Sequence, residues 1–287
     1  MARHPATTAG GLAVITGAAS GIGLAAAAQF ARLGMRVLLV DVDEARLAAA
    51  ADQVAAAAPE GRDAVDTFVA DVSRRAELGR LATHVGTLPG GADVVMANAG
   101  IQPGSRLFGG EDTWRAVIDV NLWGVIDTCR MLVPGMIAGG KPGLVIVTGS
   151  KQGITTPPGD PAYNVAKAGV KAFAEALEHE LRSTTEGRVS ARLLIPGFVF
   201  TPLTARGRVE KPAGAWTPEE TIAFMMERLE AGDFYILCPD GETTRELDRR
   251  RIAWAAGDVI DNRPPLSRWH PDHAEAFKAS LADLAGS

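Results

Sequence analysis

The segment Gly11-Leu12-Ala13-Val14-Ile15-Thr16-Gly17-Ala18-Ala19-Ser20-Gly21-Ile22-Gly23 decides the fold. Residues 11–16 form a short apolar run that suits a buried parallel strand. Glycines follow at 17, 21 and 23, and an Ala-rich stretch of helical composition then extends to Leu33-Gly34. Such glycines let the backbone turn tightly and approach a pyrophosphate, which the N-terminus of the next helix stabilises. The segment therefore predicts a dinucleotide-binding loop, the alternative being an ordinary glycine-rich connection.

A carboxylate closes the second predicted strand, residues 35–41. Asp41 lies 24 residues beyond Gly17, near the separation expected for a side chain that binds the adenosine ribose. A carboxylate there accepts hydrogen bonds from both ribose hydroxyls and would repel a 2′-phosphate. Val42 follows, and no Arg or Lys occurs at positions 18–20. The sequence therefore predicts NAD(H) rather than NADP(H) as the cofactor.

A tyrosine and a lysine stand four residues apart in Tyr163-Asn164-Val165-Ala166-Lys167, within a stretch of helical composition. Residues at this spacing share one face of a helix. A free tyrosine has a pKa near ~10, and a fixed positive charge beside it lowers that pKa. Lowering the pKa by ~3 units needs about 4 kcal/mol, which one buried ammonium and a cationic cofactor ring can supply. The pair is predicted to transfer protons, although the same spacing alone is more often a solvated helix face.

Further motifs follow in a fixed order. Asn98-Ala99-Gly100 comes after the apolar run 92–97, Asn121 lies in Val120-Asn121-Leu122-Trp123-Gly124, Ser150 ends the apolar run 143–149, and Pro196-Gly197-Phe198-Val199-Phe200-Thr201 follows the run 189–195. Together with the glycine loop and the Tyr-Lys pair, these motifs resemble the short-chain dehydrogenase/reductase family over about residues 10–240. The resemblance implies a carbonyl/alcohol oxidoreductase whose four catalytic positions are Asn121, Ser150, Tyr163 and Lys167.

The resemblance also implies the role of each catalytic residue. Tyr163 would take the hydroxyl proton during alcohol oxidation and return it during carbonyl reduction, while Ser150 holds the same oxygen. Lys167 would bind the nicotinamide ribose and tune Tyr163. Asn121 would hold a water that links Lys167 to solvent; a buried Asn at a helix kink is the alternative.

Cofactor contacts are implied along the whole domain. The pyrophosphate would lie on the loop and Ile22, the adenine beside the pair Asp71-Val72, and the nicotinamide beside Val199 and Thr201. The full set of expected cofactor contacts is Gly17, Ser20, Gly21, Ile22, Gly23, Asp41, Asp71, Val72, Asn98, Tyr163, Lys167, Pro196, Val199 and Thr201.

Strand-like and helical stretches alternate along the chain without a long linker, which predicts one doubly wound domain. The expected fold is α/β, a three-layer Rossmann fold with a seven-stranded, mostly parallel sheet, over residues 10–240. Residues 241–287 form an expected C-terminal extension, with a helix over 241–257 and an irregular segment over 262–269. This extension would shape the pocket entrance of its own or a neighbouring subunit, or cap the sheet edge. The strands are expected near 12–16, 35–41, 64–70, 92–97, 143–149, 189–195 and 233–238, and the long helices near 111–138 and 160–183.

The substrate is indicated only by residues next to the motifs, namely Gln102, Gln152, Phe198 and Phe200. Residues 202–216 suit a mobile lid. Phe198, Phe200 and Trp216 favour an apolar, aromatic secondary alcohol or ketone, unless these rings only pack the lid. No basic residue stands in place for a substrate carboxylate except Arg106 and Arg206.

Three functions compete. The first is an NAD-dependent dehydrogenase of a hydrophobic secondary alcohol, which the sequence favours. The second is a dehydrogenase of a polar polyol, sugar or dihydrodiol. The third is a non-catalytic dinucleotide sensor or scaffold, against which the complete catalytic set argues, because a sensor needs only the glycine loop.

Composition narrows the partners to small molecules and copies of the chain. The net charge of −5 disfavours nucleic acid, and no stretch is apolar enough to span a membrane. Residues 1–10 lack the apolar core of a secretory signal, and the two cysteines have no redox or metal motif, so a cytoplasmic protein without a metal is expected. His270 and His273 lack a third ligand, and Arg249-Arg250-Arg251 suits the exposed side of a helix.

The resemblance implies a homodimer or homotetramer that associates through the two long helices. The apolar residues that fit such an interface, or equally the chain's own core, are Trp123, Leu132, Val133, Ala172, Phe173 and Leu177.

Overall fold

Seven parallel strands form one sheet in the computed structural model, which describes residues 3–205, 207–241 and 243–281. The strand order is β3-β2-β1-β4-β5-β6-β7, and every neighbouring pair is parallel. The predicted three-layer Rossmann fold is therefore confirmed, with a sheet that is parallel throughout its described strands. The strands are β1 (Leu12–Thr16), β2 (Arg36–Asp41), β3 (Val65–Val69), β4 (Val94–Ala97), β5 (Gly143–Thr148), β6 (Val189–Ile195) and β7 (Tyr235–Leu237).

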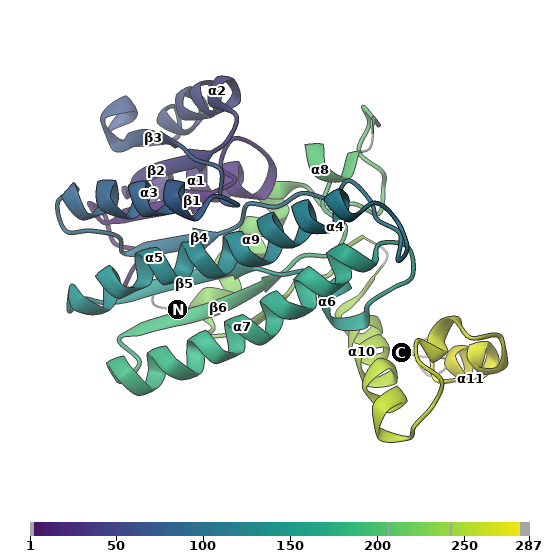
Figure 1. Cartoon of the computed structure of the whole chain (residues 1–287). Coiled ribbons are helices and arrows are strands. Elements are labelled where there is room, and N and C mark those ends of the chain that lie inside the picture. The colour runs from purple at the N-terminus through teal and green to yellow at the C-terminus, as the bar shows by residue number, and fades with distance from the viewer. Residues whose placement is uncertain (1–2, 206, 242, 282–287) are drawn as a thin grey trace.

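Helices cover both faces of this sheet (Figure 1). One face carries α1 (Gly21–Arg32), α2 (Glu44–Ala55) and α9 (Pro218–Glu230); the other carries α3 (Arg75–Thr87), α5 (Gly124–Ala138) and α7 (Pro161–Thr185). Among the described residues, none of these helices combines the length and apolarity needed to cross a membrane. The shorter elements are η1 (Gly61–Ala64), α4 (Glu111–Ile118), η2 (Asp119–Trp123), α6 (Gln152–Thr155) and α8 (Pro202–Ala205).

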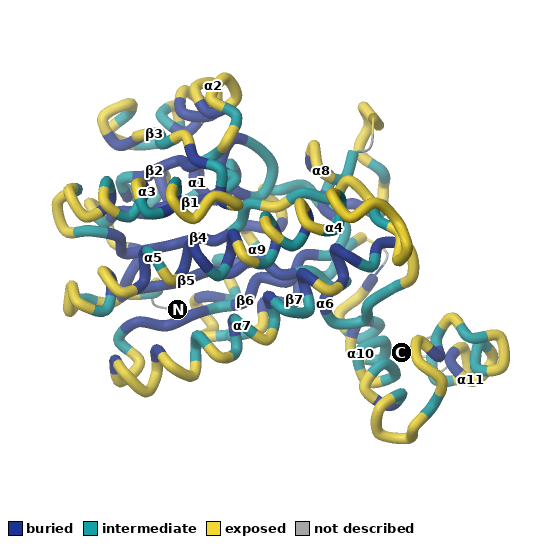
Figure 2. The backbone as a smooth tube through the Cα atoms, in the orientation of Figure 1, coloured by how far each residue is buried: buried dark blue, intermediate teal, exposed yellow. Residues whose placement is uncertain are grey.

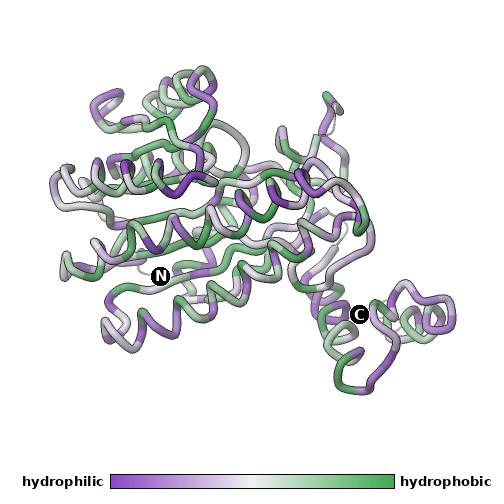
Figure 3. Tube along the Cα trace, viewed as in Figure 1, coloured by the Kyte–Doolittle hydropathy of each residue, from purple (hydrophilic) through white to green (hydrophobic). Residues whose placement is uncertain are grey.

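The strands are apolar on both sides because each side faces a separate core. Ala13 and Ile15 of β1 belong to the core under α1, whereas Leu12 and Val14 belong to the core on the opposite face. Successive side chains of a strand point to opposite faces, so a strand buried on both has no polar alternation. The central strands are accordingly buried in Figure 2 and hydrophobic in Figure 3.

The sheet order reverses between β1 and β4. The chain leaves β1 toward β2 and β3 on one side and returns to β4 on the other. In open parallel sheets, ligands bind in the crevice beyond the carboxyl ends of the strands at such a reversal. The fold therefore directs attention to the loops after β1, β4 and β5.

The long helix expected over 111–138 is interrupted, which corrects the prediction. Between α4 and α5 the chain forms the π-helical turn η2, which contains Asn121. A π turn inserts an extra residue into the helix and is frequent at functional sites. The composition of this stretch is helical on both sides, so it gives no signal for the insertion.

The C-terminal extension stands beside the sheet and not on it (Figure 1). It consists of α10 (Arg245–Ile260), η3 (Ser267–Trp269), η4 (Pro271–His273) and α11 (Ala274–Ala279). Thr244 caps α10 by accepting from the N–H of Leu247 at 3.2 Å, so the helix starts later than the expected residue 241. It contacts the rest of the chain mainly at α6, and Arg245 also donates to the carbonyl of Leu237 in β7 at 3.1 Å.

The apolar residues expected at a subunit interface divide between core and surface. Leu132 and Val133 are buried in the core beneath α5, so they take the second of the two expected roles and serve the chain's own packing. Phe173 and Leu177 pack at the edge of the same core. Trp123 is 49% exposed and therefore remains available to a partner.

Candidate functional site

The glycine loop joins β1 to α1 in a conformation that requires its glycines. Gly17 and Gly21 have φ of 67° and 56°, in the left-handed region. A Cβ at Gly17 would lie 2.8 Å from Cα of Ala99, and one at Gly23 would lie 2.1 Å from the carbonyl oxygen of Gly17. Ser20 begins α1, and no side chain caps the helix. The free N–H groups of this first turn suit a pyrophosphate.

Asp41 is fixed at the end of β2 by three backbone donors. Its Oδ1 accepts from the N–H of Val42 at 2.8 Å and of Asp43 at 3.2 Å, and its Oδ2 accepts from the N–H of Ala19 at 3.0 Å. The carboxylate therefore keeps its position beside the glycine loop, where an adenosine ribose would lie. Arg46, at the start of α2, forms an ion pair with Asp43 at 3.2 Å.

Asn98 ties the ends of three strands together. Its Nδ2 donates to the carbonyl of Thr16 after β1 at 3.2 Å, and its Oδ1 accepts from Oγ1 of Thr148 at the end of β5 at 3.1 Å. Its own N–H donates to Oγ1 of Thr16 at 3.0 Å. These contacts hold the floor of the crevice between β1 and β4 in one shape.

The predicted catalytic residues come from β5 and the start of α7. Pro161 opens α7 at its first position, which places Tyr163 in the first turn and Lys167 one turn later. The Nζ of Lys167 donates to the carbonyl of Thr148 at 2.8 Å and lies 5.7 Å from the centre of the Tyr163 ring. Tyr163 is 8% exposed and Lys167 3%. Ser150 follows β5, and it is hydrogen-bonded to the phenol.

The protein groups shift both pKa values. Burial raises the pKa of Tyr163 to about 12, with a smaller contribution from Asp160, and the hydrogen bond with Ser150 opposes it. Burial lowers the pKa of Lys167 to about 8. The protein alone therefore does not lower the pKa of Tyr163 as expected. Desolvation disfavours the phenolate more than the neighbouring groups favour it. At neutral pH the phenol keeps its proton.

Asn121 is fully buried, and its side chain forms hydrogen bonds with the backbone of Ile101. Its Oδ1 accepts from the N–H of Ile101 and its Nδ2 donates to the carbonyl of Ile101, both at 2.7 Å. The amide thus anchors the segment after β4 to the π turn. Two roles were expected for Asn121, binding a water or being a buried Asn at a helix kink, and this geometry matches the second.

Most of the predicted cofactor residues line one cavity of about 350 Å³. Asp71, Val72 and Gly23 do not line this cavity, and Gly23 instead packs closely against the backbone of Gly17. Asp71 forms a turn with Ser73, and Val72 packs against Gly124. The predicted residues that do line the cavity are Gly17, Ser20, Gly21, Ile22, Asp41, Asn98, Ser150, Tyr163, Lys167, Pro196, Val199 and Thr201.

A second cavity of about 380 Å³ adjoins Ser150 and Tyr163. Three of the four expected substrate residues, Gln102, Gln152 and Phe198, line it, but Phe200 does not. Phe200 instead pairs through its backbone with Trp216, whose ring packs on Phe224 at 5.7 Å. Of these aromatics, the Trp216 ring is therefore used for packing, and Phe200 is held by its backbone away from the cavity wall.

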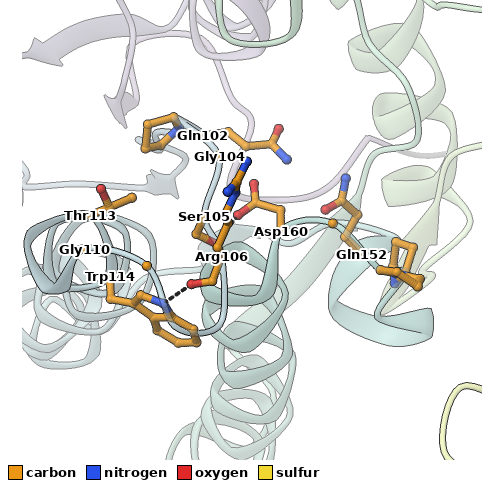
Figure 4. A pocket seen from close by; sticks show the side chains of 14 residues that line it. Gln102, Gly104, Ser105, Arg106, Gly110, Thr113, Trp114, Gln152 and Asp160 are labelled. Atoms are coloured by element: carbon orange, nitrogen blue, oxygen red, sulfur yellow. Dashed lines mark hydrogen bonds between the residues drawn. The ribbon is translucent and has the colours of Figure 1, made fainter.

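A third and larger cavity, of about 710 Å³, shares Gln102 and Gln152 with the second. Figure 4 shows these side chains with Arg106 and Asp160 along its wall. Asp160 is 7% exposed; its Oδ1 accepts from Oγ of Ser105 at 2.5 Å, and its buried Oδ2 has no hydrogen-bond partner among the described residues. Arg206, the other basic residue considered for a substrate carboxylate, lies outside the described residues.

The structure adds residues that the sequence did not indicate. Thr148, the last residue of β5, accepts from Nζ of Lys167 through its backbone carbonyl, a contact that no side-chain pattern indicates. Thr204 lines both the first and second cavities. Lys151 and Asp240, paired at 3.2 Å, also line the second cavity, and no local pattern connects residues so far apart in the sequence.

Comparison with known proteins agrees with this arrangement. The family model described as short chain dehydrogenase matches residues 11–211. A 1-deoxy-11-beta-hydroxypentalenate dehydrogenase of Streptomyces avermitilis is 35% identical, over 84% of this chain and 89% of its own length. A short chain dehydrogenase/reductase of Burkholderia phymatum, solved in complex with NAD, has a TM-score of 0.80 at 29% identity and covers 92% of this chain and 98% of its own.

A second solved relative carries a different cofactor. An alcohol dehydrogenase of the archaeon Thermococcus sibiricus, complexed with 5-hydroxy-NADP, has a TM-score of 0.71 at 28% identity, covering 82% of this chain and 98% of its own. The chain therefore belongs to the short-chain dehydrogenase/reductase family, an oxidoreductase family whose members here bind a nicotinamide dinucleotide.

Proposed function

We propose that the protein is an NAD-dependent dehydrogenase that interconverts a hydrophobic secondary alcohol and its ketone. The observation that carries the proposal is the position of Ser150, Tyr163 and Lys167 on the same cavity wall as Asp41 and the glycine loop. A dinucleotide bound along that wall would have its ribose at one end and its reactive ring beside the phenol. The relative named as a dehydrogenase of 1-deoxy-11-beta-hydroxypentalenate supports an alcohol as the reacting group.

The nicotinamide, when bound, supplies the acceptor or donor of hydride. Ser150 would hold the substrate oxygen through its Oγ and stabilise negative charge that develops on it. Tyr163 would exchange a proton with that same oxygen, giving it during ketone reduction and taking it during alcohol oxidation. Because burial keeps the phenol protonated at neutral pH, the protein's own groups favour Tyr163 as the acid, which is its state for reduction.

Lys167 would position both the cofactor and Tyr163. Its ammonium is anchored on the carbonyl of Thr148, which leaves its other two donors for ribose hydroxyls. Its pKa of about 8 means that a substantial fraction loses its proton just above neutral pH. Asn121 would bind a water through its backbone carbonyl, because its side-chain amide is occupied by Ile101.

The preference for NAD rests on Asp41. A carboxylate held by three backbone donors cannot turn away from a 2′-phosphate and would repel it. Arg46 lines the same cavity and is the cation that could oppose this effect, but its guanidinium is paired with Asp43. We therefore expect this protein to differ in its cofactor from the Thermococcus sibiricus relative solved with 5-hydroxy-NADP.

The decisive experiment follows the absorbance of NADH with NAD⁺ and then NADP⁺ against aryl, alicyclic and polyol alcohols. Turnover of a bulky apolar alcohol with NAD⁺ supports the proposal. Activity with polyols alone, or better use of NADP⁺, contradicts it. A Tyr163→Phe variant under the same conditions tests whether the turnover depends on this site.

A polar diol or polyol is the second candidate substrate. The third cavity favours it, since the unpartnered Oδ2 of Asp160 could accept a hydrogen bond from a second hydroxyl group. An Asp160→Asn variant separates the candidates: it should raise the KM for a diol and leave the KM for the matched mono-alcohol unchanged.

A further inference from the structure

The C-terminal extension encloses a cavity that none of the catalytic residues lines. It has a volume of about 360 Å³ and lies between α6 and α10. Much of its wall is apolar, formed by Ile154, Leu237, Ile252 and Trp269. A neighbouring cavity of about 380 Å³ continues it along α10. Together they suit an apolar molecule that enters past α6.

Two arginines line both of these cavities. Arg251 comes from α10 and Arg268 from η3. They lie close enough that the charge of Arg251, after burial, lowers the pKa of Arg268. Two guanidinium groups held near each other repel, so their arrangement is stabilised when an anion lies between them.

No direct ion pair joins either guanidinium to a carboxylate among the described residues, although the charge of Asp248 acts on both. Arg251 donates from Nη1 to Oγ1 of Thr243 at 3.3 Å, and its Nε is buried without a hydrogen-bond partner. Arg268 lies over the rings of Trp269 and Phe277, at 4.7 and 5.1 Å from their centres. These ring contacts fix its direction but accept none of its hydrogen bonds.

The described carboxylates that line the two cavities, Asp248 and Asp258, are already paired with other cations, Asp258 with Arg263 at 3.1 Å. Asp248 lies 2.6 Å from Nζ of Lys151. Asp240, on the far side of Lys151, is shared with the same ammonium at 3.2 Å. Lys151, Arg251 and Arg268 thus face the two carboxylates of Asp240 and Asp248, which leaves one surplus positive charge in this region.

This arginine-lined cavity adjoins the candidate substrate cavity. Both cavities are lined by Lys151 and Gln152, and the substrate cavity also touches Ser150 and Tyr163. A molecule whose hydroxyl group reaches Tyr163 would have to pass Gln152 to reach the arginines. An apolar skeleton would lie against Ile154 and the Trp269 ring.

We propose that Arg251 and Arg268 form a carboxylate-binding subsite at the distal end of the substrate cavity. The substrate class is then an apolar secondary alcohol that carries a carboxylate remote from the reacting carbon. This inference rests on the proposed function for its hydroxyl end, while the anion subsite itself is defined by the two arginines alone. It also departs from two expectations, because the carboxylate would not bind at Arg106, and Arg251 would belong to an anion site and not to the exposed side of a helix.

The first test measures binding without turnover. Isothermal titration of the full-length protein with 1-naphthoate and with neutral 1-naphthamide compares a carboxylate with its uncharged analogue. We expect naphthoate to bind at least about tenfold more tightly, because charge-assisted hydrogen bonds to arginine are strong. Arg251→Gln and Arg268→Gln should each weaken naphthoate about tenfold or more and leave naphthamide unchanged.

The matched control is Arg249→Gln. Arg249 is on the same helix, but its side chain is 72% exposed and paired with Glu246. This variant should bind naphthoate as the parent protein does. Arg268→Lys, which keeps the charge, separates loss of the anion contact from loss of packing on Phe277. Equal affinity for naphthoate and naphthamide, or unchanged naphthoate affinity in the Gln variants, overturns the subsite.

The second test links the subsite to the reaction. 4-(1-Hydroxyethyl)benzoate and its methyl ester are compared as substrates with NAD⁺. The Gln variants should raise the KM for the acid about tenfold, with little change in kcat and none in the KM for the ester. If naphthoate binds through the arginines but neither alcohol is oxidised, the proposed function fails and the subsite stands. If both are oxidised with the same KM in every variant, the subsite fails and the proposed function stands.

Discussion

The Nζ of Lys151 lies 2.6 Å from Oδ2 of Asp248, and this contact joins the residue after Ser150 to helix α10. The same ammonium lies 3.2 Å from Asp240, whose Oδ2 also accepts from the N–H of Phe198. One cation thus fixes β5, the Pro-Gly turn and the extension to one another. Burial raises the pKa of Asp248, and Lys151 opposes that shift.

Asp248→Asn should destabilise the protein and slow turnover, because Lys151 loses the shorter of its two ion pairs. We expect a loss of about 1–2 kcal/mol in the free energy of unfolding, less than for a lone buried pair because Asp240 remains. The kcat should fall several-fold, since the backbone of Lys151 bonds to Pro196 beside the site. Denaturant unfolding and steady-state kinetics measure both effects. Glu246→Gln, on the outer side of the same helix, is the control; an equal loss there would show a general effect of the helix charge.

Tyr163→Phe should abolish turnover and keep the cofactor. The phenol oxygen is the proposed proton donor, and removal of a general acid lowers kcat by about 10²–10⁴-fold. The ring itself packs in the small core with Val117 and Ala166, which phenylalanine can fill. Fluorescence titration with NADH measures the affinity, which should stay within about twofold. A variant that turns over at the parental rate would exclude Tyr163 as the donor.

Cofactor preference should depend on Asp41. We expect kcat/KM to be at least about tenfold higher with NAD⁺ than with NADP⁺, equivalent to about 1.4 kcal/mol. Asp41→Ala should reduce this ratio, because the repulsion of a 2′-phosphate is lost and Arg46 remains nearby. Asp52→Asn, an exposed position on α2, should leave the ratio unchanged. An unaltered ratio in Asp41→Ala would assign the selectivity elsewhere.

The tyrosine pKa can be measured optically because the chain has two tyrosines. The hydrogen bond to Glu175, and then burial, raise the pKa of Tyr235 to about 12 as well, so Tyr235→Phe isolates Tyr163. We expect no phenolate absorbance up to about pH 10.5 in the cofactor-free variant, whereas a free tyrosine is mostly ionised there. Addition of NAD⁺ should move the onset to lower pH. Ionisation near ~10 without cofactor would show that burial does not control this group.

Acid should weaken the protein through His4. Burial, and then the charge of Arg192, lower its pKa from 6.5 to about 4. The folded state therefore favours the neutral ring, so the stability it contributes is present above pH 6.5 and is lost as the pH falls toward 4. In His4→Gln, the free energy of unfolding should fall by about 1 kcal/mol less between pH 6.5 and pH 4 than in the parent protein. This difference is small because the ring is partly solvated. Denaturant unfolding at several pH values measures this difference, with the exposed position His179→Gln as the control. If the free energy of unfolding depends on pH in the same way in both variants, the assignment to His4 is wrong.

The sequence predicts the sheet well because its central strands are buried on both faces. Residues 12–16 and 189–195 are apolar runs that end at turn residues, and the strands have those same limits. The glycine loop and the Tyr-Lys pair are also local patterns, which explains why the family could be recognised. The π turn at Asn121 was missed because an inserted residue changes hydrogen bonding and leaves composition unchanged.

The rest of the site depends on contacts between distant segments. The cluster around Lys151 joins residues separated by 89 positions, and no spacing rule connects them. Arg251 lies in a run of three arginines that resembles a solvated helix face, yet η3 folds back over it and makes a cavity. The pKa of Tyr163 differed from the expectation for the same reason, since burial is set by the whole fold.

The extension meets the rest of the chain mainly through α6, and Figure 2 shows much of it partly or fully exposed. A segment with few buried contacts opens more readily than a core of packed strands. We expect α10 and η3 to exchange their amide hydrogens in a separate, earlier unit than β1 and β4. On warming, the C-terminal extension would then open first, and the protein would stop binding the far end of a substrate while the nucleotide crevice is still intact. The highest temperature at which the protein works is therefore set by the extension and not by the sheet.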